Sequence, residues 1–150
     1  MTEPPWTLEF DRPFHFWFFY VSHAQLVLRS PRRGHEPRID VIFTFTGEFN
    51  LPRTLDDLRI DALAPHDPRH KELGVQRLDF IGVERTAYAI TASNFQNGLV
   101  TAHRVEIQET DREYDDIHPF EGDLPYMSFE EPYPAYDEGP LRSRFADPVI

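Results

Sequence analysis

The alternation of apolar and polar positions indicates a chain built from β-strands, most clearly between residues 14 and 45. Successive side chains of a strand point to opposite faces, so residues 14–21 are aromatic or apolar on both faces. Such a strand is buried on both sides or lies at a subunit interface. One face holds Phe14, Phe16, Phe18 and Tyr20, and the other holds His15, Trp17, Phe19 and Val21.

Two further segments extend this pattern. Ser22 and His23 interrupt the aromatic run, and residues 25–29 form a second strand or the same strand after a bend or bulge. Residues 31–37 form a loop, because they contain two prolines and a glycine. Residues 38–45 alternate cleanly and predict an inward apolar face and a mostly polar outer face. The pattern permits a cross-strand Arg29–Asp40 pair, which would contribute only about 0–1 kcal/mol if exposed.

The remaining body has shorter elements. We expect strands at residues 6–10, 59–63 and 75–83, a short helical turn capped by Thr54 through Leu58, and a polar loop at residues 64–74. Residues 84–92 and 99–108 predict a second hairpin, because Asn97-Gly98 suits a type I′ turn. Within it, Tyr88 and Ile90 face away from Ala87 and Ala89, and residues 99–108 form one continuous strand.

The composition changes near residue 110. Residues 110–150 contain six prolines and no sustained period, yet aromatic rings are interleaved with the acids. We therefore expect a β domain at residues 1–109 and an acidic, aromatic, proline-rich segment at 110–150, either packed on the domain or extended. The fold class is mainly β, an antiparallel sandwich or partly open barrel with a long irregular acidic C-terminal segment.

The charge is distributed unevenly over these 150 residues. Residues 1–105 hold 13 acids and 12 bases, a net charge of −1, whereas residues 106–150 hold 13 acids and 3 bases, a net charge of −10, which together give −11. Such a surface repels nucleic acid and attracts a basic protein. The chain has no cysteine, no signal-peptide pattern and no apolar run of membrane-spanning length, so we expect a cytoplasmic protein that does not enter a membrane.

Candidate chemistry is sparse. His66 and His70 have the spacing of helical metal ligands, but Pro68 between them favours a solvated loop. The acids between residues 111 and 123 lack the spacing of a calcium loop. His15, His23 and His103 are candidate general bases, although a histidine among aromatic residues is more often structural. No common catalytic or nucleotide-binding motif occurs, so we expect no metal and no cofactor.

The aromatic run, Ser22-His23, residues 26–29 and residues 38–41 together resemble small bacterial β domains. Some of those domains are similar to immunity proteins of toxin systems. The likeness covers about a third of the chain and involves no functional motif.

Three functions remain open at this stage. The first is a non-catalytic interaction domain, immunity-like or an adaptor, that binds a basic partner through an acidic and aromatic surface. The second is a small β-barrel for an apolar ligand, and the third is an enzyme that uses histidine and carboxylate. A homodimer through the aromatic strand is a further alternative. The first hypothesis places the binding residues in the acidic segment: Tyr114, Asp115, Asp116, Phe120, Tyr126, Phe129, Tyr133 and Tyr136.

Overall fold

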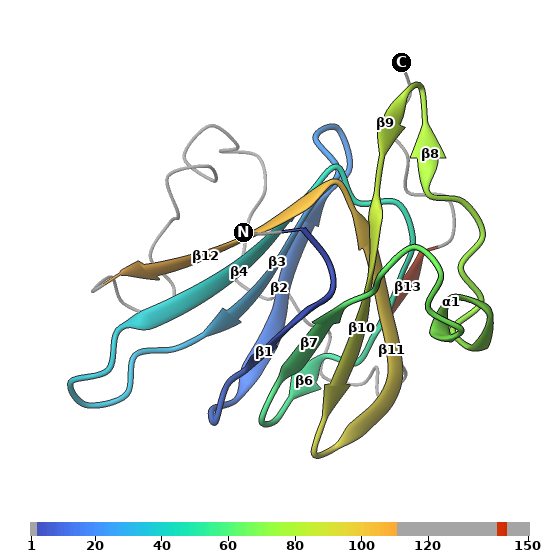
Figure 1. The fold of residues 1–150 in the computed structure, drawn as a ribbon. Helices are drawn as coiled ribbons and strands as arrows, with labels where there is room; N and C mark the ends of the chain where they lie inside the picture. The colour runs from blue at the N-terminus through green and yellow to red at the C-terminus, as the bar shows by residue number, and fades with distance from the viewer. Residues whose placement is uncertain (1–2, 111–140, 144–150) are drawn as a thin grey trace.

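The computed structural model describes residues 3–110 and 141–143, which form two main antiparallel sheets (Figure 1). Sheet A contains, in spatial order, β1 (Trp6–Glu9), β7 (Arg59–Ala62), β10 (Thr86–Ala92), β11 (Phe95–Ala102), β5 (Phe49–Leu51) and β13 (Leu141–Ser143). Sheet B contains β12 (Arg104–Thr110), β4 (Arg38–Thr44), β3 (Gln25–Ser30), β2 (Phe14–Tyr20) and β6 (Thr54–Leu55). The expected mainly β fold with antiparallel sheets is confirmed, and the sheets do not close into a barrel.

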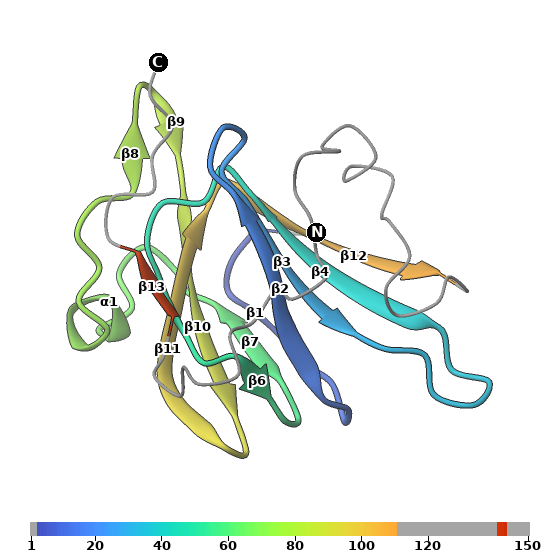
Figure 2. The same ribbon diagram turned by 180° about the vertical axis from the view of Figure 1, so that it is seen from behind.

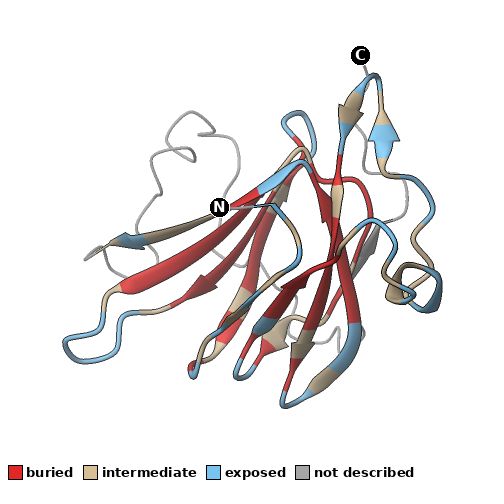
Figure 3. Cartoon of the chain, viewed as in Figure 1, coloured by how far each residue is buried: buried red, intermediate tan, exposed pale blue. Residues whose placement is uncertain are grey.

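The core lies between the two sheets. Leu28 and Phe43 from sheet B meet Ile60, Ile90 and Val100 from sheet A in one cluster of fully buried side chains. Period-2 alternation places these residues on the inner faces, and Figure 3 shows the central strands as buried. The expected division of β10 is also confirmed, because Tyr88 and Ile90 belong to this core whereas Ala87 and Ala89 face the other side of sheet A.

The outer face of sheet A is covered by the segment that follows β7. Leu73, Val75 and Leu78 pack against a second cluster of Leu63, Ala87, Ala89 and Leu99. This segment contains α1 (Arg69–Glu72), a single helical turn inside the expected polar loop. The expected strand at residues 75–83 is wrong in extent, because only β8 (Asp79–Phe80) and β9 (Val83–Glu84) pair there as a small hairpin. Gly82 at the reversal has φ +74°, which glycine adopts without strain.

The outer face of sheet B is buried and carries both apolar and charged side chains. Trp17, Phe18, Tyr20, Val27 and Ile42 form a buried cluster there. Beside it, Arg29, Arg38 and Asp40 are also fully buried. The prediction that residues 14–21 are buried on both faces is confirmed for Phe14–Tyr20, whereas Val21 is exposed. The mostly polar outer face predicted for residues 38–45 carries Arg38 and Asp40, and both are buried. Asp40 and Ile42 are both buried, which single-strand periodicity does not report.

Two irregularities correct the expected strand alternation. The β2–β3 register shifts between Phe16 and Phe18, so Phe16 faces the core while Trp17 and Phe18 both join the outer cluster. A bulge places two consecutive side chains on one face, which strict alternation misses. Ser22 and His23 form the turn between β2 and β3, so residues 25–30 are a second strand.

The second hairpin turns earlier than predicted. Ala92 pairs with Phe95, so the chain reverses at Ser93-Asn94, and Asn97 and Gly98 lie inside β11. The positive φ of Asn97, +62°, serves a bulge opposite Thr91. The continuous strand expected at residues 99–108 is also wrong, because the chain bends at His103 and passes from sheet A to sheet B.

Two shorter predicted elements, at residues 54–58 and 59–63, have different outcomes. Thr54 does not cap a helical turn, because Thr54 and Leu55 form β6 and pair with His15 and Phe14. The strand at residues 59–63 is confirmed as β7, with Ile60 and Ala62 directed to the core. The described part of the chain has no helix long and apolar enough to cross a membrane.

Candidate functional site

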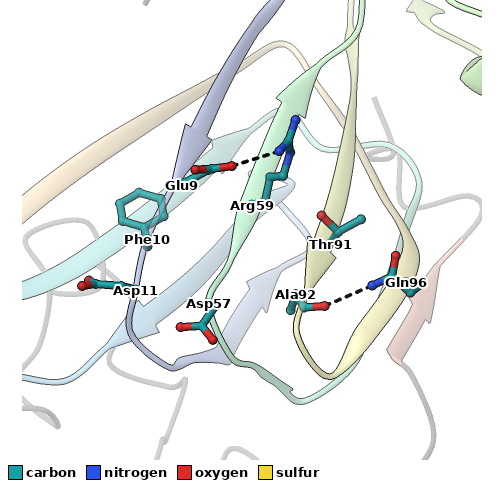
Figure 4. A pocket seen from close by; sticks show the side chains of 8 residues that line it. All are labelled: Glu9, Phe10, Asp11, Asp57, Arg59, Thr91, Ala92 and Gln96. Atoms are coloured by element: carbon teal, nitrogen blue, oxygen red, sulfur yellow. Dashed lines mark hydrogen bonds and ion pairs between the residues drawn. The ribbon is translucent and has the colours of Figure 1, made fainter.

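A polar pocket opens at the end of sheet A where β1 finishes and the β6–β7 and β10–β11 turns meet (Figure 4). Its volume is about 600 Å³, within the usual range of ligand sites. The lining combines three carboxylates, one guanidinium, one aromatic ring and small polar groups: Glu9, Phe10, Asp11, Asp57, Arg59, Thr91, Ala92 and Gln96. We call it the acidic pocket.

Sheet register builds one wall of the acidic pocket. Glu9 pairs with Arg59, and Arg59 pairs in turn with Thr91, so the three side chains form a row across β1, β7 and β10. The Arg59 guanidinium lies 2.9 Å from a Glu9 carboxylate oxygen and 3.2 Å from Asp61 Oδ2. The hydrogen bond to Asp61 is the main reason that the pKa of Arg59 is raised, so Arg59 stays charged.

Backbone hydrogen bonds fix the turns that carry the remaining pocket residues. The Phe10 amide donates to the Leu58 carbonyl at 2.9 Å, which holds the residue after β1 against β7. The Asp56 amide donates to Asn94 Oδ1 at 2.9 Å, and the Ser93 amide donates to the Asp56 carbonyl at 2.8 Å. These hydrogen bonds hold the turns of the pocket rim in place before any ligand binds, which lowers the entropic cost of binding.

The electrostatics of the acidic pocket favour a cation. Glu9, Asp11 and Asp57 bring three negative charges and Arg59 brings one positive charge, so the lining carries a net charge of −2. Arg59 is already engaged by carboxylates, whereas the exposed Asp11 and Asp57 border the opening beside Phe10. Carboxylates beside an aromatic face suit a lysine or arginine side chain, whose stem packs on the ring while its charge meets the acids.

Asp61 accepts a hydrogen bond from Arg59 and so holds this side chain in the wall of the acidic pocket. Burial opposes its ionisation, but hydrogen bonds from the Thr7 hydroxyl at 2.6 Å and from Arg59 outweigh that effect, so the pKa of Asp61 is lowered. Arg69 of α1 adds a further contact at 3.2 Å to Asp61 Oδ2. This ionised carboxylate fixes the direction of Arg59, whose guanidinium also contacts Glu9 of the acidic pocket.

The candidate general bases lie in separate places. His15 is on the outer face of sheet B, and burial lowers the pKa of this imidazole. His23 stacks against Tyr20 in the β2–β3 turn, with ring centroids 4.6 Å apart. The Nδ1 atom of His103 lies 3.1 Å from the Glu84 carbonyl at the bend between the sheets. The three imidazoles therefore do not form a common site.

The metal candidate at residues 66–72 also remains dispersed. His66 precedes α1, and the Nε2 atom of His70 lies 3.0 Å from the Ala64 carbonyl, as in a structural loop. Within residues 3–110 and 141–143, no group of three histidine or carboxylate side chains is placed to hold a metal ion.

The binding residues predicted from the sequence all lie outside the described residues. The acidic pocket was missed because its members come from three sequence regions that only sheet pairing brings together. One local signal was present, the acidic pair Asp56-Asp57 before a strand. That pair lies in the helical turn predicted at residues 54–58, which begins in the structure with β6.

The chain matches no known protein-family model, and neither the curated proteins nor the solved structures include a detectably similar chain.

Proposed function

We propose that this protein is a non-catalytic interaction domain, of the immunity or adaptor type, that binds a basic protein partner. The observation that carries the proposal is the acidic pocket, in which Asp11 and Asp57 border a half-buried Phe10 at a rim held by backbone hydrogen bonds. The net charge of −11 adds long-range attraction for a basic surface and disfavours nucleic acid. The cytoplasm is the proposed compartment, on the support of the cysteine-free composition.

The proposed contact places one lysine or arginine side chain of the partner in the acidic pocket. Its charge lies between Asp11 and Asp57, and its aliphatic stem packs on Phe10. Rim contacts of this kind determine the association rate and specificity more than affinity, so binding should weaken as salt is raised. The acidic segment at 110–150 adds to the same attraction through its charge.

The test titrates the full 150-residue chain with two synthetic peptides, one rich in lysine and one of equal length with glutamine in its place. Backbone NMR signals report the site. Binding of the lysine peptide should shift the amide signals of Phe10, Asp57 and Thr91, and the glutamine peptide should not. Shifts spread evenly over all acidic residues would contradict a defined site.

A matched pair of variants separates the pocket from the overall charge. The double variant Asp11→Asn/Asp57→Asn should weaken binding of the lysine peptide about fivefold, as expected for two rim charges. Asparagine suits position 57, where φ is +55°. The control Asp79→Asn/Glu84→Gln removes the same charge from the exposed β8–β9 hairpin and should leave binding almost unchanged. Equal losses in both variants would overturn the pocket as the site.

A further inference from the structure

The first strand, β1, lies at the edge of sheet A. β1 and β7 are side by side in both views of the ribbon (Figures 1 and 2). Among the strands that the structure describes, β7 is the only partner of β1. The described pairings of sheet A are all antiparallel. The other side of β1 therefore offers its backbone to one more antiparallel strand.

The register shows which backbone groups point to that free side. Opposed pairs in an antiparallel ladder alternate between those that exchange backbone hydrogen bonds and those that do not. The Phe10 amide donates to the Leu58 carbonyl, at the next position of the ladder after Glu9. The amides and carbonyls of Thr7 and Glu9 therefore point away from β7. Both residues are exposed, so these groups are open to a partner strand.

The inner side chains of β1 leave apolar surface open at this edge. Trp6 and Leu8 alternate with the exposed residues of β1 and point toward the core, yet both are only half-buried. Their partners on β7 are Ala62 and Ile60, which are 2% and 0% exposed. A strand added beyond β1 would cover this remaining apolar surface.

A second pocket lies at the start of β1. Trp6, Pro4, Tyr88 and Val105 supply its apolar lining, and its volume is about 200 Å³. That volume is below the roughly 300–1,000 Å³ of small-molecule sites, and it suits a single apolar side chain. We call it the Trp6 pocket. Because Trp6 lines this pocket and Glu9 lines the acidic pocket, the two pockets lie at opposite ends of β1, about 10 Å apart along the strand.

The charges along this edge favour a basic segment. Residues 3–11 contain no base and three acids: Glu3, Glu9 and Asp11. Two arginines line the pockets, but Arg59 lies 2.9 Å from Glu9 and Arg104 lies 3.5 Å from Glu106. Two copies of β1 paired with each other would bring the same acids together, which like-charge repulsion disfavours. A basic segment of another protein fits this edge better than a second copy of the chain.

We propose that the basic partner docks as an extended strand that pairs antiparallel with β1. The inference rests on the proposed function and adds the conformation and the side-chain order of the segment that binds. Backbone hydrogen bonds to Thr7 and Glu9 supply affinity, and side chains in the two flanking pockets supply specificity.

Antiparallel pairing defines the order of side chains in the partner segment. Its first residue lies opposite Glu9 on the outer face and is a lysine or arginine that reaches the acidic pocket. The second residue lies opposite Leu8 on the inner face and is apolar. The third lies opposite Thr7, and the fourth lies opposite Trp6, where an apolar side chain enters the Trp6 pocket. The order is therefore basic, apolar, variable, apolar.

Hydrogen exchange in the full 150-residue chain tests the pairing. The probe is a short peptide with lysine, isoleucine, threonine and leucine in that order at its centre and serine at its ends. Bound peptide should slow exchange of the Thr7 and Glu9 amides about tenfold or more. The Leu8 amide already bonds to β7 and should change far less. Amide shifts of Asp57 and Thr91 report the acidic pocket in the same sample.

The inference and the proposed function fail in different ways. Shifts at Asp57 and Thr91 with unchanged exchange at Thr7 and Glu9 would keep the acidic pocket as the site and overturn the added strand. Absence of both changes would overturn the proposed function as well. Slow exchange at Thr7 and Glu9 that needs only a higher concentration of the protein would assign the edge to a second copy and overturn the basic segment.

Two N-methylated peptides test the register. The amides of the first and third central residues point to β1, and those of the second and fourth point away. A methyl group on the third amide should weaken binding about fivefold or more, the effect of one lost backbone hydrogen bond. The same group on the second amide should leave binding almost unchanged. Equal losses for the two peptides would overturn the pairing.

A matched pair of variants tests the same contact from the side of the protein. Thr7→Pro removes an amide that faces away from β7, a position where an edge strand accepts proline. Thr7→Val keeps the amide and, like the proline variant, lacks the hydroxyl. Peptide binding should be about fivefold weaker for Thr7→Pro than for Thr7→Val. Unchanged amide signals of β10 show that each variant is folded, and equal affinities of the two folded variants would overturn the proposal.

Discussion

Arg29 and Asp40 face each other across the β3–β4 ladder and form a two-point ion pair in which neither side chain is exposed. An ion pair in water contributes little, but a buried carboxylate that loses its charge leaves its guanidinium partners uncompensated. The pair therefore links the register of two central strands to the stability of the whole domain.

We expect Asp40→Asn to lower the free energy of unfolding by about 3–5 kcal/mol, because Arg29 and Arg38 would each lose a buried carboxylate partner. Urea denaturation measures the loss. The control Asp79→Asn removes an exposed carboxylate and should change stability by less than about 0.5 kcal/mol. A loss below 1 kcal/mol for Asp40→Asn, measured the same way, would show that water reaches the pair.

The identity of this pair was predictable, and its environment was not. Alternation in residues 38–45 placed Arg29 and Asp40 opposite each other, because strand register follows from the hydrophobic pattern. Periodicity within one strand does not say whether a second layer covers the polar face. The contribution of about 0–1 kcal/mol applies to an exposed pair, whereas both side chains are buried here.

The errors elsewhere share a physical cause. Asn97-Gly98 is a strong local turn signal, but tertiary pairing uses the left-handed conformation of Asn97 for a bulge and turns the chain at Ser93-Asn94. The bend at His103 moves the chain between sheets without a glycine or proline to mark it. The acidic pocket likewise depends on contacts between residues about 50 positions apart, such as Glu9 and Arg59, which local patterns do not contain.

His15 should make the protein less stable in mild acid. Burial lowers the pKa of this imidazole below its usual value of 6.5, and Asp56 offsets part of the shift. The folded state then binds fewer protons than the unfolded state. Stability is complete above the unfolded pKa and falls as the pH drops below 6.5 toward the folded pKa.

We expect His15→Gln to reduce the loss of stability between about pH 7 and pH 5, because glutamine does not titrate. Thermal or urea denaturation at several pH values measures this dependence. His35→Gln, in the exposed β3–β4 loop, should leave the dependence as it is in the natural chain. An identical pH profile for the natural chain and His15→Gln would contradict the assignment.

The hydroxyl of Thr7 should stabilise the wall behind the acidic pocket. It donates a hydrogen bond of 2.6 Å to Asp61 Oδ1, and bonds of this kind are one reason that the pKa of Asp61 is lowered. Thr7→Val should cost about 1–2 kcal/mol of unfolding free energy near neutral pH. Thr7→Ser keeps the hydroxyl and should recover most of it.

The same variants have a distinct acid signature. A carboxylate with a lowered pKa stabilises the fold above its unfolded pKa of 3.8, and this contribution is lost as the pH falls through the folded pKa. The difference between the natural chain and Thr7→Val should therefore shrink below 3.8. A difference that stays constant down to strong acid would indicate lost packing instead of a lost hydrogen bond.

A substitution at Gly98 tests whether this residue pairs with Ile90 inside the second hairpin. A methyl group at this position would lie 2.7 Å from the Ile90 carbonyl oxygen and 3.0 Å from a carbon of the Phe95 ring. Gly98→Ala should thus cost about 1–3 kcal/mol through overpacking between β10 and β11. Asn97→Gly is the matched control, since position 97 is exposed with φ +62° and should change stability by less than about 0.5 kcal/mol. If Gly98→Ala were as stable as the natural chain by urea denaturation, the backbone of β11 would not approach Ile90 so closely, and the bulge would have to be placed elsewhere.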